Sequence, residues 1–390
     1  MIKTVITGYA RTPIGSFLGC LSKVSAVNLG AIAIKAALQK SNIKSSEINE
    51  VIMGHVLSAG VGQAPARQAS LAANISNNVP CTTVNEVCGS GLKSVIMACQ
   101  SIALSESNIV IAGGMENMSQ SPYLLLNARN GMRMGNKLVL DSMITDGLWD
   151  PYGNAHMGNF GDLCAEKYNF SRNEQDSFAK ISYERALLAI KQGKFDKEIV
   201  PVSISRKKNL TTIRNDEEPN NFNCEKMLKL KSAFSVNGTV TVANASKIND
   251  GAAAVVLMNA DIAKSEGIKP VAEILSSATF THEPTWFTTA PIFSIKKACE
   301  KANIDIVDID LFEINEAFSV VPMVAMKELK LFHEKVNVFG GAIALGHPIG
   351  ASGTRILCTL LNAMEDNDVE IGCASICLGG GGALSMILKR

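Results

Sequence analysis

The sequence lacks paired cysteines, long apolar runs and an excess of either charge. None of its ten cysteines belongs to a Cys-x-x-Cys pair, which argues against a zinc ribbon. No uninterrupted apolar stretch reaches the roughly 18 to 20 residues that a membrane-spanning helix needs, so we expect no membrane insertion. The 37 basic and 36 acidic side chains leave a net charge of +1, and nucleic acid is therefore not the expected partner.

Targeting signals are also missing from both ends of the sequence. The chain opens on MIKTVITGYARTPIGSF, which is typical of a strand and a turn and not of a charged tip followed by an apolar run. The last residues, MILKR, are not a peroxisomal address. We therefore expect a cytoplasmic protein whose cysteines are reduced and act mostly as small core residues.

The sequence is rich in apolar material for a large core. Hydrophobic residues make up 47% of the 390 residues and charged residues 19%, a balance typical of a globular chain with more than one domain. Strand-like and helix-like runs alternate, as in KTVITGYA, AVNLGAIAIKAALQKSNI and EVIMGHV. This alternation predicts the α/β class, with largely parallel strands.

Two halves of the sequence repeat one pattern. Residues 35–54 resemble residues 296–315 in order and spacing, because each stretch predicts a helix, an Asn-Ile turn, an acidic connector and a strand. SNIVIAGGMENMS likewise corresponds to GCASICLGGGGALSMIL, since both are apolar strands that end at glycines. An internal repeat of this kind predicts two core domains of one topology.

A segment of different composition separates the halves. It is rich in Asn, Met, Gly and charge, and its clearest element is a helix capped by Ser171 and Glu174. Long insertions in compact folds are usually functional, often lids or binding loops. We therefore predict an N-terminal core domain of residues 1–119 with 246–270, a loop domain of residues 120–245 and a C-terminal core domain of residues 271–390.

Four glycine-rich stretches each carry one reactive side chain at a predicted strand end or helix start. They are Cys88 in NEVCGSG, Asn315 in EINEAF, His347 in GHPIG and Cys377 in SICLGGGG. Loops at the carboxyl ends of strands form the site in α/β folds. Because a Cys–His pair generates a nucleophile at neutral pH, the set indicates nucleophilic chemistry. The structural alternative is a packed thiol, a core histidine and a capping asparagine.

The position of Cys88 suits a nucleophile. At a helix N-terminus, unpaired backbone N–H groups and the macrodipole stabilise a thiolate. Gly89 and Gly91 would leave room for a substrate carbonyl, and the N–H of Cys88 itself would point at a developing oxyanion.

Glycines 379 to 382 follow shortly after Cys377. A dinucleotide-binding loop also uses glycines, but the G-x-G-x-x-G spacing is absent and no acidic residue follows about 20 residues later. Glycine N–H groups that face an oxyanion fit better, and Cys377 would then serve as an acid and base.

Taken together, these stretches resemble the thiolase family, and within it the acetyl-CoA C-acetyltransferases, essentially from end to end. The matching strings, in family order, are RTPIGSF, NEVCGSGLKS, AGGMENMSQSPY, HMG, NGTVTVANAS, INDGAAA, EINEAFS and GGAIALGHPIGASG. The resemblance implies the thiolase fold, with two duplicated core domains in a five-layer αβαβα arrangement plus a loop domain. It also implies a dimer or a homotetramer built as a dimer of dimers, with the homotetramer as the expectation, and reversible condensation of two acetyl-CoA molecules to acetoacetyl-CoA and CoA.

The resemblance assigns a role to each reactive residue. Cys88 would be the acylated nucleophile, His347 would take its proton, and Cys377 would remove a proton from the second acetyl-CoA. Asn315 would hold a water that completes one oxyanion hole with His347, and the N–H groups of Cys88 and Gly379 would form the other.

The resemblance also assigns a binding site for CoA, in which structural packing is the alternative for each side chain. His156 and Met157 would shape the acyl pocket, and Ser246 would meet the pantetheine arm. Phe234, Ala317 and Phe318 would line the tunnel. Coenzyme A enters as substrate and product, so no resident cofactor is implied. Some relatives hold potassium partly through a tyrosine after an acidic run, and Pro219 in NDEEPNN counts against potassium here.

Several departures from the family pattern leave the catalytic groups intact. Phe339 and Lys247 stand where relatives often have Asn and Gly, MGNFGD replaces a commoner string, and EPTWFTTAP at 283–291 favours relatives that admit a 2-methyl branch. The alternatives are a 3-ketoacyl-CoA thiolase of broader chain length or a 2-methylacetoacetyl-CoA thiolase. A β-ketoacyl synthase-type enzyme would lack a thiol base such as Cys377, and a non-catalytic CoA or lipid carrier would have lost the reactive residues.

Overall fold

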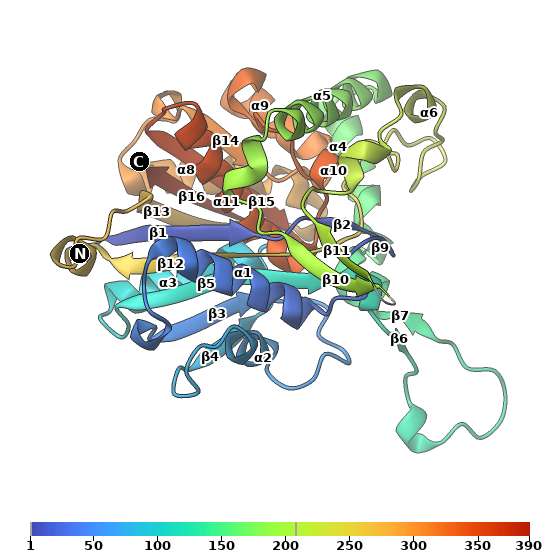
Figure 1. Cartoon of the computed structure of the whole chain (residues 1–390). Coiled ribbons are helices and arrows are strands. Elements are labelled where there is room, and N and C mark those ends of the chain that lie inside the picture. The colour runs from blue at the N-terminus through green and yellow to red at the C-terminus, as the bar shows by residue number, and fades with distance from the viewer. Residues whose placement is uncertain (1, 207–208) are drawn as a thin grey trace.

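The computed structural model describes residues 2–206 and 209–390, and one ten-stranded sheet forms its centre (Figure 1). The strand order is β14-β15-β16-β13-β1-β12-β5-β3-β4, with β2 paired to β12. The strands of this sheet are β1 (Thr4–Arg11), β2 (Gly15–Ser16), β3 (Glu50–Gly54), β4 (Cys81–Val84), β5 (Ile109–Asn117), β12 (Asn249–Asn259), β13 (Ala272–Thr281), β14 (Leu311–Ile314), β15 (Ile371–Leu378) and β16 (Gly382–Lys389).

Helices cover both outer faces of the sheet and fill the space between its two wings. The N-terminal wing contains β1, β3, β4, β5 and β12, and the C-terminal wing contains β13, β14, β15 and β16. They are α1 (Ala26–Ser41), α2 (Pro65–Ala72), α3 (Ser90–Ala103), α7 (Ala260–Ser265), α8 (Ala290–Ala302), α9 (Val320–Leu329), α10 (Ala342–Leu345) and α11 (Ile349–Asp366). Helices α1 and α2 pack on the N-terminal wing, α8 and α9 lie on the outer side of the C-terminal wing, and α11 contacts α3 and strands of both wings. The sheet thus folds over a central helical layer, which confirms the five-layer αβαβα prediction.

The central layer is the most buried part of the molecule. Every residue of α11 from Ile349 to Met364 is buried, and α3 faces it closely. One hydrophobic cluster joins side chains of α3, α11 and both wings. In α3 the buried residues include Leu92, Val95, Ile96, Ala98 and Ile102, whereas Gln100 and Ala103 are exposed, so this helix buries one broad face against the central layer.

The prediction of largely parallel strands is wrong. Only the β3–β4, β3–β5 and β14–β15 pairs in the described part of the main sheet are parallel, whereas the pairs made by β1, β12, β13 and β16 are antiparallel. The reason at the C-terminus is the short glycine turn between β15 and β16, since a hairpin can only join antiparallel strands. Gly380 and Gly381 have φ of 86° and 87°, a conformation that favours glycine.

The internal repeat is visible in the structure. Helices α1 and α8 end at left-handed caps, Asn42 and Asn303, and a 3₁₀ turn leads in each half to a strand near one edge of the sheet, β3 or β14. Strand β3 pairs in parallel with β5, and strand β14 pairs in parallel with β15. The two segments that resemble each other in sequence therefore form the same local structure.

The segment between β5 and β12 lies apart from the main sheet. It contains the strands β6 (Tyr123–Leu124), β7 (Leu140–Asp141), β8 (Trp149–Asp150), β9 (Ala155–His156), β10 (Val202–Arg206) and β11 (Asn209–Ile213), and the helices α4 (Met157–Tyr168), α5 (Arg172–Lys191) and α6 (Cys224–Leu228). Helix α5 has the predicted capping box of Ser171 and Glu174. Strands β6 and β7 begin an arm that leaves the body of the molecule (Figure 1).

A buried arginine ties this segment to the core. Arg11, at the end of β1, donates from Nε to Glu198 and from both Nη atoms to Asp216 at 2.7 and 2.8 Å. All three side chains are fully buried. Since a buried charge is tolerated only when paired, the two acidic residues fix the inserted segment against β1. No helix in the described part of the chain is long and apolar enough to cross a membrane.

Candidate active site

Cys88 lies in the turn between β4 and α3, directly before the helix that Gly89 caps. Its neighbour Val87 has φ of 48°, a left-handed conformation that a β-branched residue rarely adopts. Ser90 Oγ donates to Val87 O at 2.6 Å and accepts from the Glu86 N–H at 2.8 Å, which holds the turn. Backbone strain of this kind is typical of functional sites.

The thiol of Cys88 faces two backbone donors. Its own N–H and the N–H of Gly379 both interact with Sγ, so the two groups expected to form an oxyanion hole converge on this sulfur. Although the residue as a whole is half-buried, burial around the thiol raises the pKa of Cys88 to about 12 against the effect of the two N–H groups. The prediction of a thiolate stabilised by the helix N-terminus is therefore wrong for this state, and a base is needed.

The two glycines beside Cys88 serve packing and not substrate access. A Cβ on Gly89 would lie 2.6 Å from Leu378, and a Cβ on Gly91 would lie 2.9 Å from Thr354 N. These contacts let α3 approach β15 and α11 closely. The space that the sequence led us to expect for a substrate carbonyl is filled by protein at both positions.

The second thiol, Cys377, stands at the end of β15 and is almost fully buried. It lies close enough to Cys88 for the two thiols to influence each other, and burial followed by the charge of Cys88 raises the pKa of Cys377 well above its usual value. Gly379 follows β15 directly, and the terminal methyl of Met157 lies 3.9 Å from where its Cβ would be. Cys88, Cys377, Gly379 and Met157 therefore meet at one point.

His347 lies between α10 and α11 and is buried. Its Nδ1 is 2.6 Å from Ser352 Oγ, its backbone N–H donates to Asn249 Oδ1 at 2.9 Å, and its Nε2 has no partner among the described residues. Burial, and secondarily the charge of Arg355, lowers the pKa of His347 to about 3. Ile349, two residues on, shares a hydrophobic cluster with Cys88, which brings this loop to the thiol.

Asn315 directly follows β14 and is also buried. Its N–H donates to Ser375 O at 2.9 Å, two residues before Cys377 on the neighbouring strand. Its amide nitrogen, Nδ2, has no partner in the described part of the chain. A buried donor without a partner is costly, so Nδ2 is free to bind a water or a substrate oxygen.

An aromatic wall begins beside this point. His156, the N-cap of α4, stacks on Phe234 with ring centroids 4.7 Å apart, and Phe234 meets Phe318 edge-on at 6.1 Å. Since Met157 follows His156 and lies near Gly379, the structure brings these predicted binding residues next to the thiols. Burial lowers the pKa of His156, so this ring is a neutral surface at neutral pH.

Ser246 and Ala317 continue the wall by backbone pairing. The Ser246 N–H donates to Ala317 O at 2.9 Å. Lys247, next along the chain, donates from Nζ to Val242 O at 2.5 Å and to Ala245 O at 3.0 Å. The ammonium group of Lys247 therefore binds carbonyl groups of the segment just before it in the chain. Burial lowers the pKa of Lys247 to about 8.

The other residues that depart from the family pattern have structural roles in packing or hydrogen bonding. Phe339 is buried and meets Phe195 edge-on, so it belongs to the core. Phe287, in the short helix η7 (Pro284–Thr289), is buried and contacts Phe318 from behind the aromatic wall. Asp162, in MGNFGD, accepts from two backbone N–H groups at 2.8 Å each and fixes the loop beyond α4.

Four supporting residues escaped the sequence analysis. Ser352 and Asn249 hold His347, while Glu116 accepts from Gly350 N at 2.9 Å, just beyond that histidine. Arg355 lies near Asn315. Ser352 follows His347 by five residues within one glycine-rich string, a spacing that offered a signal, whereas the other contacts join distant segments and gave none.

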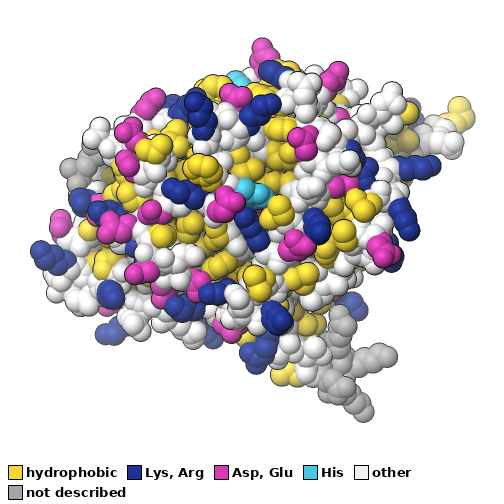
Figure 2. Space-filling view, turned by 90° about the horizontal axis from the view of Figure 1, so that it is seen from above, with side chains coloured by type: hydrophobic (Ala, Val, Ile, Leu, Met, Phe, Trp, Pro, Cys, Tyr) yellow, Lys and Arg dark blue, Asp and Glu magenta, His cyan; other side chains and the backbone are white. Residues whose placement is uncertain are grey.

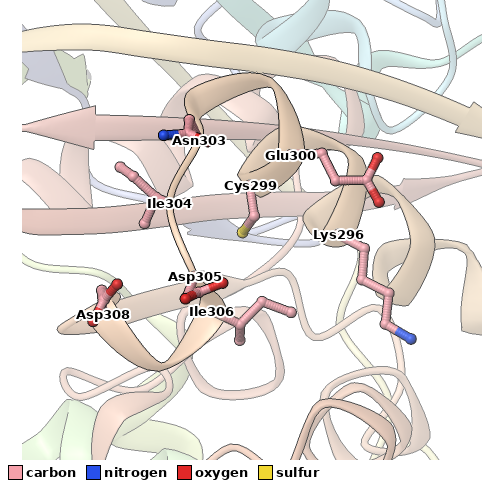
Figure 3. Close-up of a pocket in the computed structure, with 8 residues that line it drawn as sticks. All are labelled: Lys296, Cys299, Glu300, Asn303, Ile304, Asp305, Ile306 and Asp308. Atoms are coloured by element: carbon pink, nitrogen blue, oxygen red, sulfur yellow. The ribbon is translucent and has the colours of Figure 1, made fainter.

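Two hollows on the described part of the surface contain none of the predicted site residues. Figure 3 shows one at the end of α8, where side chains of α8 and the 3₁₀ turn η8 (Ile306–Asp308) converge, and none of the predicted site residues lines it. A larger one lies along α4 on the inserted segment, with Phe160 and Asp162 in its wall. The face in Figure 2 mixes basic and acidic side chains without a field of one sign, in line with the balanced net charge.

Comparisons with known proteins identify the family of the chain. The family description "Thiolase, N-terminal domain" matches residues 4–261, and "Thiolase, C-terminal domain" matches residues 268–390. The chain is 47% identical to acetyl-CoA acetyltransferase 2 of Arabidopsis thaliana, with 98% of this chain and 96% of the relative covered. It is 50% identical to the cytosolic acetyl-CoA acetyltransferase of Rattus norvegicus, with 99% and 98% covered. Among solved structures, the Acat5 thiolase of Ascaris suum in complex with coenzyme A has a TM-score of 0.95 at 42% identity, and all of both chains is covered.

Proposed function

Because the chain belongs to the thiolase family, we propose that it is an acetyl-CoA acetyltransferase. It joins two acetyl-CoA molecules into acetoacetyl-CoA and CoA, and it runs the reverse thiolysis. The observation that carries the proposal is the convergence of two thiols and two backbone N–H groups at Cys88. A second thiol beside the nucleophile supports a thiolase over an enzyme that uses histidine or asparagine alone.

The first half-reaction transfers an acetyl group to Cys88. Its raised pKa means that the thiol is neutral, so a base must take the proton as sulfur attacks the thioester carbon. The neutral, unpartnered Nε2 of His347 suits that role, with Nδ1 held by Ser352. The carbon–sulfur bond to CoA then breaks, and the leaving thiolate takes the proton from His347.

The second half-reaction needs a base at carbon. His347 first takes the proton of Cys377, and the resulting thiolate removes a proton from the methyl group of the next acetyl-CoA. The thioester oxygen of that acetyl-CoA becomes negative and is stabilised by the protonated His347 and by a water on Asn315. The resulting carbon attacks the acetyl group on Cys88. The N–H groups of Cys88 and Gly379 then stabilise the oxyanion until the bond to sulfur breaks, and the Cys88 thiolate takes the proton that His347 holds. In thiolysis Cys377 returns the proton.

The inserted segment holds the CoA arm in this proposal. His156, Met157 and Phe234 shape the acyl pocket, Phe318 and Ala317 line the tunnel, and Ser246 meets the pantetheine arm; the stacked and edge-on aromatic contacts support one continuous wall. Large aromatic rings on the wall restrict the acyl group to short chains. Coenzyme A enters only as substrate and product, and no resident cofactor or potassium ion is part of the proposal.

A 2-methyl branch on the substrate is the specific second candidate. Phe287 meets Phe318 at 6.3 Å and Phe160 at 6.5 Å, so the loop that favoured this candidate in the sequence supports the tunnel wall from behind. A wall supported in this way sets the width of the pocket near the α-carbon. 2-Methylacetoacetyl-CoA is therefore the substrate that separates the two candidates.

The assembly we propose is a homotetramer, a dimer of dimers, in the cytoplasm. The arm between β6 and β7 exposes large apolar side chains, with Met134 exposed by 92% and Leu138 by 82%. An extended apolar surface away from the core is typical of an interface. The ten cysteines, all in the described part of the chain, are free thiols, which supports a reducing compartment. Light scattering of the protein and of a variant with Leu138→Ser would separate tetramer from dimer.

Thiolysis of acetoacetyl-CoA tests the reaction, because condensation is unfavourable on its own. The assay follows CoA-dependent loss of acetoacetyl-CoA, 2-methylacetoacetyl-CoA and longer 3-ketoacyl-CoA substrates. Cys88→Ser should abolish turnover, whereas Cys224→Ser, a half-buried thiol in α6, should leave it unchanged. Absence of turnover in the wild type would contradict the proposed function, and a preference for long chains would contradict only the short-chain assignment.

A further inference from the structure

Arg355 is a buried cation in the central helix α11, with only 1% of its surface exposed. Its Nη1 donates to Glu313 Oε1 at 2.9 Å. Its Nη2 lies 3.5 Å from Asn315 Oδ1, and its Nε has no partner in the described part of the chain. A buried ion pair gives little net stability compared with apolar residues of similar size. The position of the pair beside Asn315 therefore calls for another explanation.

The backbone around Asn315 is fixed from two sides. Its own N–H donates to Ser375 O at 2.9 Å. The side chain of Asn337 accepts from Ile314 N and donates to Ile314 O, both at 2.8 Å. With the backbone held, the remaining freedom of Asn315 lies in its side chain, whose amide can present either oxygen or nitrogen to a given neighbour.

The guanidinium group of Arg355 decides that orientation. An arginine has donors and no acceptor, so it attracts the amide oxygen and repels the amide N–H₂. With Oδ1 toward Arg355, Nδ2 turns to the other side, where it has no partner among the described residues. The unpartnered Nε2 of His347 lies in the same site, and the charge of Arg355 acts on that ring as well.

We propose that Arg355 is a positioning residue of the reaction, which holds the amide of Asn315 so that Nδ2 points into the active site. Glu313 compensates the buried charge of the guanidinium group. The inference rests on the proposed role of Asn315 as the residue that binds the oxyanion water. Arg355 touches no substrate atom in this scheme and acts only through Asn315.

The variant that isolates this role is Arg355→Lys. Lysine keeps a charge for Glu313 but lacks the planar fork that reaches two acceptors at once. We expect kcat of thiolysis to fall about 10- to 100-fold, because a small misplacement of a positioned group has an effect of that size, while KM stays within about twofold. Glu313→Gln is the matched control, since it weakens the same buried pair but leaves the fork beside Asn315. It should lower the melting temperature with kcat within about threefold of wild type.

A double-mutant cycle with Asn315→Ala separates positioning from stability. If Arg355 acts through Asn315, then Arg355→Lys in the Asn315→Ala background should change kcat by less than about twofold. Full additivity of the two effects would overturn the proposal, as would an equal loss of kcat in Glu313→Gln. If Asn315→Ala alone leaves kcat unchanged, the role of Asn315 fails and the inference fails with it, a result distinct from additivity.

A neutral pair provides the same test if the lysine variant does not fold. Arg355→Gln with Glu313→Gln removes both charges together, so no unpaired charge is buried. The positioning role predicts a lower kcat for this pair, with no further loss when Asn315→Ala is added. Wild-type kcat in the folded neutral pair would overturn the proposal.

Discussion

The two halves of the sheet place different chemistry at equivalent positions. In each half one residue directly follows strand β3 or β14. A second residue lies on the neighbouring strand, β5 or β15, two residues beyond the last residue that pairs with β3 or β14. These residues are His55 and Glu116 in the N-terminal half, and Asn315 and Cys377 in the C-terminal half. The repeated topology therefore places two residues at equivalent positions in each half of the sheet.

The N-terminal pair is saturated with partners. His55 Nε2 lies 3.2 Å from Glu116 Oε1, and the carboxylate also accepts from the N–H groups of Val56, Leu57 and Gly350. The C-terminal positions instead leave a buried amide N–H₂ without a described partner and a thiol next to a second thiol. One half therefore supports the loop that carries His347, and the other supplies groups that react.

The largest effect should come from removing the thiol of the reacting half. Cys377→Ala should lower kcat of condensation and thiolysis by roughly 10²- to 10⁴-fold, the range typical of a general acid and base. Cys373→Ala is a matched control, because this buried thiol lies on the same face of β15. Steady-state kinetics should show wild-type kcat in the control, and an equal loss in both variants would mean that packing and not chemistry is responsible.

The next effect should come from the supporting half and should concern stability. Glu116→Ala leaves three backbone donors and His55 without their acceptor in a buried site, so the free energy of unfolding should fall by about 3 kcal/mol or more. Urea titration at fixed protein concentration measures it. Glu273→Ala, which removes a surface pair with Lys3, should cost less than about 1 kcal/mol. A Glu116→Ala variant with the wild-type free energy of unfolding would contradict the supporting role of the N-terminal half.

The pH dependence of stability should show the burial of His347. Its pKa is lowered from the ordinary value to about 3, so the unfolded chain binds more protons below about pH 6.5. Stability from this group is therefore present above that pH and is lost as the pH falls toward 3, by up to about 1.4 kcal/mol per unit.

The comparison of wild type with His347→Asn isolates this slope. Burial raises the pKa of the Asp250 carboxyl to about 6 and also raises the pKa of Glu313, and both carboxyls contribute in the opposite direction. Because both carboxyls are present in each protein, the difference between the two pH profiles reports His347 alone. Identical profiles between pH 6.5 and 4 would contradict the assignment of a neutral, buried imidazole.

The smallest effect should come from His55. His55→Asn retains a donor near Glu116, so the free energy of unfolding should fall by only about 1 kcal/mol, and kcat should stay within about twofold. Thermal unfolding and the thiolysis assay measure the two quantities. Asn315→Ala in the same assay is the counterpart, and a similar kcat loss in both variants would mean that the two halves are not divided in this way.

Local sequence predicted elements and motif positions well. The Asn-Ile turns at Asn42 and Asn303 and the capping box of Ser171 follow from short-range patterns, whereas the five-layer core was implied by the family resemblance. Strand direction did not follow, because the partners of β1 and β13 are set by contacts far apart in the sequence. Gly91 shows the same limit, since only the path of α11 reveals that this glycine serves helix packing.

The electrostatic state of the site was the least predictable part. The position of Cys88 before a helix suggested a thiolate, but burial by residues from both halves raises its pKa instead. Arg355 and Glu116 are distant in sequence from the groups they support. Their roles depend on how the halves close over the central layer, which no local pattern encodes.

Mass spectrometry after treatment with acetyl-CoA tests the division of labour between the two thiols most directly. The account predicts one acetyl group on the peptide that contains Cys88, in the wild type and in Cys377→Ala, where it persists because no carbon nucleophile forms. Adding CoA should remove it from both proteins. An acetyl group on Cys377, or none on either thiol of the folded protein, would contradict the account.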